Sequence, residues 1–169
     1  MKIEVLRLNH RIARDVRVST HVALTSRALG ASRIYYSGQK DNSFETSVNK
    51  ITEKFGGPFE ILFEKNDIEL IKGKKRDGFT IIHLTVYGKD FREFEKTKNR
   101  NLFVVVGGEK VEPEFYKLAD FNLSVTNQPI SEVSALGIFL YEICGYREDF
   151  KNYKLKVIGS EKAKLLKKL

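Results

Sequence analysis

Three apolar segments of this chain end in residues that could hold a ligand. The first ends at 84-LTVYG-88, the second runs into the glycine pair of 107-GGEKV-111, and the third is followed by 126-TNQP-129. If these segments are parallel strands, their loops meet at the sheet edge where ligands of such sheets bind. Glycines let a ligand approach the backbone, and a helix start near 126–132 offers unpaired N–H donors. A nucleotide or nucleoside is the ligand class that fits.

Phosphate-binding patterns do not accompany these loops. Gly108 lies in neither a phosphate-loop pattern nor G-x-G-x-x-G, which disfavours an ATP-type ligand. A strand that ends in two glycines is also more often a tight turn than a ligand site. The small residues Ser131, Ser134, Ala135 and Gly137 indicate close helix packing, against the sheet or against a second subunit. Ligand contact is compatible with either arrangement.

Nucleophilic and metal chemistry find little support in the sequence. The single cysteine, Cys144, has apolar neighbours, and no serine or threonine stands in a nucleophile-elbow pattern. His10, His21 and His83 are not spaced as metal ligands on a helix. A lone histidine is more often structural, but His21 follows an arginine-rich segment and is the histidine with a predicted functional role. We therefore expect no metal site and no hydrolytic activity.

The charge of the chain favours a polyanionic partner. Thirty Lys and Arg against 22 Asp and Glu give a net charge of +8 and a pI near 9.5. The cations concentrate at 7–17, 72–76, 96–100 and 162–168. The last group, in 160-SEKAKLLKKL-169, predicts an amphipathic, solvated terminal helix.

Length and hydropathy indicate one globular domain. The chain has 169 residues, of which 41% are hydrophobic, enough for one substantial core but short for two domains. We place the domain at 1–158 and a basic tail at 159–169. The sequence shows no long uncharged apolar stretch, and the N-terminal MKIEVLRLNHR contains no signal-peptide core, so a cytoplasmic location is expected.

Alternating strand and helix patterns predict an α/β fold with a mostly parallel sheet covered by helices on both faces. Residues 9–19 are expected to form an arginine-rich loop, with Ser19 or Thr20 capping the first helix. The charged segment 64–77 is expected to be a surface loop around a short helix, and 146–158 an appended strand or hairpin. Strands are predicted at 2–8, 33–36, 59–63, 79–88, 101–111 and 121–125, and helices at 20–29, 43–55, 89–98, 113–119 and 131–143.

Four segments carry a specific resemblance: 9-NHRIARDVRVSTHVALTSRALGA-31, 82-IHLTVYG-88, 104-VVVGGEKVEPEFYKLADFNLSV-125 and 127-NQPISEVSALGIFL-140. In their order and in the G-x-E-K-V and Q-P-x-S-E-V elements, they resemble the archaeal tRNA cytidine-56 2′-O-ribose methyltransferase family of the SPOUT superfamily. The likeness extends over about residues 3–158. The chain departs from the family at Ile130, where histidine is usual, and at Glu112, before Pro113.

The resemblance implies a SPOUT-type fold with a deep C-terminal trefoil knot, an exception to the rule that chains are unknotted. It also implies a homodimer, tRNA as substrate and S-adenosylmethionine as cofactor. The cofactor would lie in the knot loops, against Leu84, Gly107, Gly108, Glu109, Lys110, Val111, Val125, Thr126, Asn127, Gln128, Pro129, Ile130, Ser131 and Glu132.

Two residues are candidates for catalysis. By resemblance, Arg17 lies near the ribose 2′-hydroxyl; because a free guanidinium cannot act as a base, it would orient the hydroxyl and a phosphate. His21 is the alternative proton acceptor. RNA-backbone contacts are assigned to Arg7, Arg11, Arg14, Lys74, Lys75 and Arg76.

Two rival interpretations remain open at this point. A noncatalytic RNA-binding module would need only the basic segments. A SPOUT enzyme with another target is the second rival, and transfer to guanine N1 would require a carboxylate base, for which Asp15 or Glu132 would serve.

Overall fold

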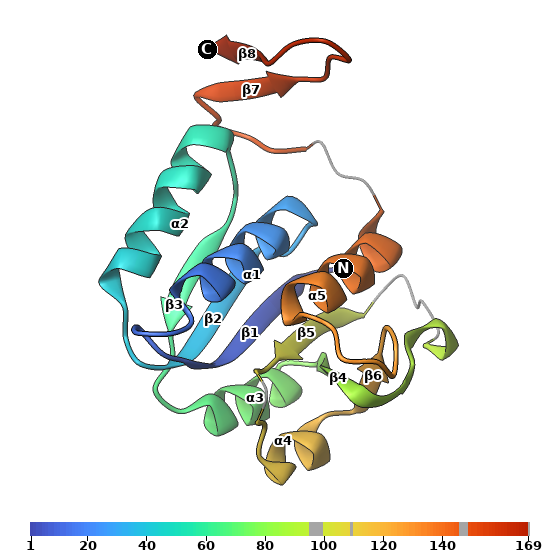
Figure 1. The fold of residues 1–169 in the computed structure, drawn as a ribbon. Coiled ribbons are helices and arrows are strands. Elements are labelled where there is room, and N and C mark those ends of the chain that lie inside the picture. Colours follow the sequence, from blue (N-terminus) through green and yellow to red (C-terminus); the bar gives the residue numbers. More distant parts are fainter. Residues whose placement is uncertain (95–99, 109, 146–148, 169) are drawn as a thin grey trace.

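The computed structural model describes residues 1–94, 100–108, 110–145 and 149–168. Within these residues, one six-stranded sheet has the order β3-β2-β1-β5-β4-β6, and every neighbouring pair is parallel (Figure 1). The predicted α/β class with a parallel sheet is confirmed. The strands are β1 (Ile3–His10), β2 (Arg33–Gly38), β3 (Glu60–Phe63), β4 (Phe79–Asp90), β5 (Asn101–Val106) and β6 (Phe121–Ser124).

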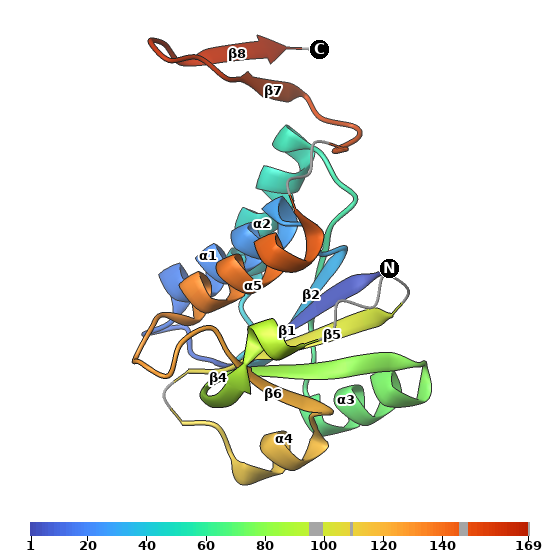
Figure 2. The ribbon, with the colours of Figure 1, turned by 90° about the vertical axis from the view of Figure 1, so that its right-hand side faces the viewer.

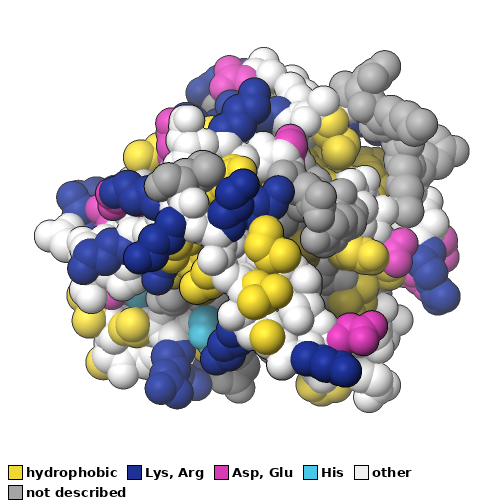
Figure 3. All heavy atoms as spheres, turned by 90° about the horizontal axis from the view of Figure 1, so that it is seen from above, with side chains coloured by type: hydrophobic (Ala, Val, Ile, Leu, Met, Phe, Trp, Pro, Cys, Tyr) yellow, Lys and Arg dark blue, Asp and Glu magenta, His cyan; other side chains and the backbone are white. Residues whose placement is uncertain are grey.

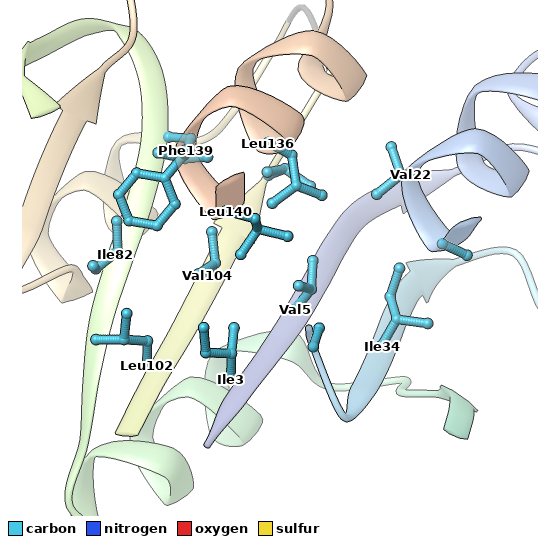
Figure 4. Packing of buried hydrophobic residues seen from close by; sticks show 14 of the residues in the cluster. Ile3, Val5, Val22, Ile34, Ile82, Leu102, Val104, Leu136, Phe139 and Leu140 are labelled. Carbon is cyan, nitrogen blue, oxygen red and sulfur yellow. The ribbon is translucent and has the colours of Figure 1, made fainter. Parts of the chain in front are cut away.

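Helices cover both faces of the sheet (Figure 2). One face carries α1 (Val16–Ala28), α2 (Asn42–Phe55) and α5 (Glu132–Cys144), and the other carries α3 (Asp67–Arg76) and α4 (Pro113–Leu118). Figure 4 shows Leu136, Phe139 and Leu140 of α5 above Val104 and Ile82 of the sheet. A second core, which contains Phe103 and Phe115, lies on the opposite face. Burial on both faces explains why the central strands are continuously apolar.

The small residues of α5, which were predicted to pack closely, do not all lie in the same surroundings. A Cβ added to Gly137 would lie 3.5 Å from Thr25 Cγ2, so α1 and α5 pack closely there. Ser134 is exposed, and the buried Leu136 and Phe139 face the sheet. The two helices thus contact each other within one chain, although 3.5 Å is an ordinary van der Waals contact and would leave room for a Cβ at this position.

The first helix begins earlier than predicted. β1 continues to His10, and α1 begins at Val16 after Asp15, so the expected loop shrinks to 11–15. Ser19 is buried inside the helix and does not cap it. Arg17 and His21 therefore belong to the helix surface, because the apolar and small side chains of the same turns face the sheet.

The helix predicted at 89–98 is wrong over its described part. β4 continues to Asp90, which pairs with Ser124 of β6, and a short 3-10 turn covers Phe91–Glu93. Asp90 starts this turn, its Oδ1 accepting a hydrogen bond from Arg92 N at 2.9 Å. Tertiary pairing with β6 outweighs the local helical pattern. Residues 95–99 of the prediction lie outside the described residues.

The C-terminal segment forms a hairpin rather than the predicted terminal helix. β7 (Leu155–Ile158) pairs antiparallel with β8 (Leu165–Lys168), which confirms the predicted strand at the end of 146–158. The helix prediction failed because Leu165 and Leu166 lie opposite Ile158 and Val157, and this pairing overrides the helical spacing. The hairpin projects from the body of the molecule (Figure 1), and a boundary at residue 158 would divide it. Among the described residues, no helix has the length and hydrophobicity that crossing a membrane requires.

Candidate functional site: a cavity at the carboxyl ends of β4, β5 and β6

The end of β4 leaves the sheet and returns to it. Leu84 and Lys89 both pair with Leu123 of β6, so residues 85–88 loop out between them. Gly88 allows the return, because a Cβ there would lie 2.5 Å from the Leu123 carbonyl carbon, inside any permitted contact. This loop forms one wall of a cavity.

Two further loops meet the first one. After β5 the chain folds back so tightly that a Cβ on Gly107 would lie 2.3 Å from Val111 Cγ2. After β6, the Asn127 side chain Nδ2 donates to the Val86 carbonyl at 2.7 Å and to the Gly88 carbonyl at 3.2 Å. The loop then ends at Ser131, which caps α5 by accepting a hydrogen bond from Val133 N at 3.2 Å. The three loops predicted to meet do so around one cavity, and Asn127 ties the third loop to the first.

They enclose a cavity of about 410 Å³, within the usual range of small-molecule sites. Its walls are mostly apolar, with a few polar groups. They are formed by His83, Leu84, Thr85, Val86, Tyr87, Gly107, Gly108, Val111, Tyr116, Leu123, Val125, Thr126, Pro129, Ile130, Glu132 and Ala135.

Most residues predicted to bind a cofactor line this cavity: Leu84, Gly107, Gly108, Val111, Val125, Thr126, Pro129, Ile130 and Glu132. Lys110, Asn127, Gln128 and Ser131 are not among its lining residues, and Glu109 lies outside the described residues. Asn127 and Ser131 instead hold the loops in place.

His83 and Tyr116 also border this site, although the sequence pattern gave no sign of it. His83 precedes Leu84 on β4, so its side chain points to the opposite face of the sheet, yet both residues border the cavity. Tyr116 comes from α4, on that opposite face. The alternation of side chains along a strand predicts the face of the sheet to which His83 points. That the cavity extends to this side chain depends on how α4 packs, which the sequence does not show.

A second, cationic cavity of about 340 Å³ adjoins the first. It is lined by Arg7, Asn9, Arg11, Arg14, Gly108, Lys110 and Glu112. Gly108 borders both cavities. Three arginines assigned to RNA contact thus lie together, next to the predicted cofactor site. Figure 3 shows that Lys and Arg side chains are spread widely over the face of the molecule seen from above.

Arg7 differs from the other arginines of this cavity because it is 2% exposed. Its Nη1 donates to the Leu8 carbonyl at 2.7 Å, and its Nη2 lies 3.2 Å from Glu132 Oε1. Burial lowers the pKa of Arg7, although the Glu132 carboxylate opposes that shift. The guanidinium assigned to RNA is therefore an interior group that joins β1 to the first turn of α5.

The second cationic segment, Lys74–Arg76, requires a correction. Lys74 is buried, with Nζ 2.6 Å from Glu4 Oε2 and above the Tyr35 ring, and Lys75 Nζ lies 2.8 Å from Asp120 Oδ1. Both side chains are already paired, and Lys74 is buried because Glu4, at the start of β1, needs a buried counter-charge. They also lie toward the amino ends of the strands, whereas the cavities lie at the carboxyl ends. Arg76 remains exposed.

Arg17 and His21 are exposed on α1, and neither is among the residues that line the two cavities. In one chain, the structure therefore does not join the two predicted catalytic side chains to the cofactor site. The described residues also contain no group of three or more His, Cys, Asp or Glu side chains arranged to hold a metal ion.

Known structures share this fold. The tRNA-modifying enzyme TrmH/SpoU of A. aeolicus superposes with a TM-score of 0.65 at 23% identity, over 84% of this chain and 73% of that one. The SpoU methyltransferase AviRb of Streptomyces viridochromogenes, solved in complex with AdoMet, superposes with a TM-score of 0.62 at 14% identity, over 85% of this chain and 57% of that one. At these identities the likeness concerns the fold alone.

Sequence relatives are much closer. The tRNA (cytidine(56)-2′-O)-methyltransferase of Methanocaldococcus jannaschii is 45% identical over 98% of this chain and 96% of its own length. The protein of the same name from Nitrosopumilus maritimus is 44% identical over 97% and 95%. A sequence profile described as "tRNA ribose 2′-O-methyltransferase, aTrm56" matches residues 55–167. This chain therefore belongs to the aTrm56 family of tRNA ribose 2′-O-methyltransferases.

Proposed function

We propose that this protein transfers a methyl group from S-adenosylmethionine to the ribose 2′-hydroxyl of cytidine 56 in tRNA. The observation that carries the proposal is the pair of adjoining cavities that share Gly108. One is a largely apolar space of nucleoside size, and the other is lined by cations that suit an RNA backbone. Methyl transfer to RNA requires these two sites side by side.

The first cavity fits S-adenosylmethionine by its size and its donor set. Its walls combine the apolar Leu84, Val111 and Val125 with the backbone of Gly107 and Gly108, where no side chain blocks a ligand. When bound, the cofactor supplies an electrophilic methyl group on sulfur, so no metal is required. Asn127 holds the loop at 85–88 in place, and the Arg7–Glu132 pair fixes the first turn of α5.

RNA would bind at the second cavity through Arg11, Arg14, Asn9 and Lys110. Contacts of this kind position the backbone without reading sequence. The buried Arg7 would support this surface from below and would contribute positive potential to it. Selection of one cytidine then depends on the shape of the folded tRNA and on an unstacked base.

Arg17 and His21 are proposed to act on the ribose hydroxyl when a second surface closes over α1. Arg17 would orient the hydroxyl and the neighbouring phosphate, and His21 is the alternative proton acceptor. Both side chains are solvent-exposed and outside the cavities of one chain. The closing surface would be the tRNA or a second copy of the chain.

A homodimer is proposed through α1 and α5. On α5, Ser134, Ile138 and Tyr141 form an exposed stripe at helical spacing, with Ile138 42% and Tyr141 53% exposed. Large apolar groups of this kind, beside small ones, suit a subunit interface. A cytoplasmic location, where tRNA is modified, is part of the same proposal.

A trefoil knot is proposed for the C-terminal half. β5 and β6 lie on opposite sides of β4, so the connection between them crosses that strand, and the loop after β6 returns to the Val86 and Gly88 carbonyls. Such a knot would also support the proposed cofactor site, because the three cavity loops would then constrain one another.

The rival with a carboxylate base for guanine N1 fits less well. Asp15 accepts hydrogen bonds from Arg11, at 2.8 Å from Nε, and the Arg11 guanidinium lowers the pKa of this carboxyl. Glu132 is paired with Arg7. Asp15 is therefore a poor proton acceptor, and both carboxylates are held in ion pairs with arginines. A noncatalytic RNA-binding module would leave the cavity of about 410 Å³ without a purpose.

The test is mass spectrometry of nucleosides and mapped fragments from an unmodified elongator tRNA transcript incubated with the protein and S-adenosylmethionine. We expect 2′-O-methylcytidine at position 56. A transcript with 2′-deoxycytidine at that position is the substrate control, because it lacks the accepting hydroxyl. Methylation of a base or of another ribose would overturn the target, and no methylation despite tRNA binding would favour the noncatalytic module.

The catalytic assignment is tested separately with Arg17→Ala, which should lower the methylation rate at least about 100-fold if Arg17 orients the reacting groups. Lys50→Ala on α2 is the matched control, because it also removes one exposed positive charge. An equal, small effect of the two substitutions would reduce Arg17 to a general electrostatic contribution.

A further inference from the structure

His83 is a buried polar group that borders the cofactor cavity. Its side chain lies on β4 and is 1% exposed. Its Nδ1 lies 2.9 Å from Asn122 Oδ1 on β6. Its other ring nitrogen, Nε2, is buried and has no hydrogen-bond partner among the residues that the structure describes.

The neighbours of His83 determine which ring nitrogen carries the proton. Asn122 Nδ2 donates to the Tyr116 carbonyl at 2.9 Å, and a carbonyl can only accept, so the amide of Asn122 has one orientation. Its oxygen therefore faces His83 and can only accept. Nδ1 of His83 must be the donor, which leaves Nε2 with an unshared lone pair and no hydrogen.

The surroundings keep this imidazole neutral. Burial lowers the pKa of His83, and the hydrogen bond to Asn122 opposes that shift without cancelling it. The ring of Tyr116 packs edge-on at 4.6 Å, at an angle of 88°. The Tyr116 hydroxyl lies 3.2 Å from Thr85 Oγ1, so it does not serve Nε2. A buried acceptor without a donor is costly, and native proteins satisfy nearly all such groups.

We infer that His83 Nε2 accepts a hydrogen bond from a neutral N–H or O–H donor in the nucleoside part of the bound cofactor. The inference rests on the proposed function, and it adds a specificity-determining side chain at the cofactor site. A neutral donor fits because the ring is uncharged and no carboxylate contacts it among the described residues. Among the described cavity residues, a cationic ammonium would find its counter-charge at Glu132 instead.

The test is calorimetric binding of S-adenosylhomocysteine to the wild-type protein, His83→Phe and His83→Gln. Phenylalanine keeps a planar ring but removes the acceptor, so the dissociation constant should rise about 3- to 10-fold. Glutamine offers an N–H toward Asn122 and an oxygen toward the ligand, and should restore part of the affinity. Urea unfolding of each variant establishes that the protein titrated is folded.

Two ligand analogues identify the donor. One carries an oxo group in place of the adenine 6-amino group, and the other lacks both ribose hydroxyls. The analogue that lacks the donor should bind the wild type more weakly, and His83→Phe should weaken its binding no further. Additive losses for both analogues would overturn the inference, since His83 would then contact neither group.

A measurement on the unmutated protein covers the case in which His83→Phe does not fold. The ¹⁵N resonance of Nε2 should show an unprotonated nitrogen in the free protein and should shift on addition of S-adenosylhomocysteine as the nitrogen accepts a hydrogen bond. An unchanged resonance, or equal affinities of the wild type and His83→Phe, would assign the nitrogen to a water molecule. Failure of the wild type to bind any of these ligands would instead overturn the proposed function, and the inference with it.

Discussion

Two buried histidines, on two strands of one sheet, have different hydrogen bonding. His10 on β1 has partners at both ring nitrogens: Nδ1 lies 2.8 Å from Ser19 Oγ of α1, and Nε2 lies 3.2 Å from Asp41 Oδ2 at the start of α2. His83 on β4 has a partner at one nitrogen only, and it borders the cavity, which His10 does not.

The difference separates a structural histidine from a ligand-facing one. Together with Ser19 and Asp41, His10 forms a Ser–His–Asp set, but all three side chains are buried and none lines either of the two cavities described above. The set joins the ends of β1, α1 and α2 and has no access to substrate. Residue type and triad-like contacts are therefore weaker guides to function here than an incomplete set of hydrogen bonds beside a cavity.

The largest expected effect comes from His10→Phe. The substitution leaves the Ser19 hydroxyl and the Asp41 carboxylate buried without their partner, so we expect a loss of about 2–4 kcal/mol in the free energy of unfolding. Urea denaturation measures it. Affinity of the folded protein for S-adenosylhomocysteine should stay within about twofold, and a stability loss below about 1 kcal/mol would contradict the structural role.

Asn122→Asp should convert His83 from an acceptor into a donor. A carboxylate beside the ring favours imidazolium and raises the pKa of His83, so Nε2 carries a hydrogen below that pKa and cannot accept one. We expect the dissociation constant for S-adenosylhomocysteine to rise about 10-fold at acidic pH and to recover as the pH increases. Calorimetric titrations of the variant and the wild type across pH 5.5 to 9 measure this. A dissociation constant of the variant that does not change with pH would contradict the role of His83 as an acceptor.

Stability should also report on His83 as the pH falls. Because burial lowers the folded-state pKa below the ordinary value of 6.5, the unfolded chain takes up the proton first. The neutral ring therefore contributes stability above about pH 6.5, and this contribution is lost as the pH falls toward the folded-state value, by at most about 1.4 kcal/mol per pH unit. Between pH 7 and 5, the free energy of unfolding of the wild type should fall more than that of His83→Phe, as measured by urea denaturation of both proteins. An equal fall for the two proteins would show that the ring is not shielded from water.

The smallest effect is expected for Tyr116→Phe. The ring that packs on His83 is retained, and only the contact between the Tyr116 hydroxyl and Thr85 Oγ1 is lost. We expect less than about 1 kcal/mol in the free energy of unfolding and a change in S-adenosylhomocysteine affinity below about threefold. A loss as large as that of His83→Phe would show that the hydroxyl, and not Nε2, holds the ligand.

Much of the fold could be predicted from local pattern. Strand and helix periodicities correctly placed most of the sheet and its covering helices, and the glycines at 88 and 107 marked the sites where the chain folds back. The predictions failed where pairing decided the outcome: at Asp90, kept in β4 by Ser124, and at Leu165 and Leu166, paired with β7. Local spacing carries no information about such partners.

By itself, the sequence determined the α/β class, the positive charge, the family and most of the residues around the cavity at the ends of β4, β5 and β6. Only the tertiary structure decided which positive charges remain available to bind RNA. In the sequence, Arg7 and Lys74 cannot be told from exposed arginines and lysines, but in the structure they are buried and paired with Glu132 and Glu4. It also decided that His10 is fully bonded and His83 is not. Burial and hydrogen bonding depend on residues that are distant in the chain. The chemistry of a side chain is therefore determined by partners that cannot be predicted from the local sequence pattern.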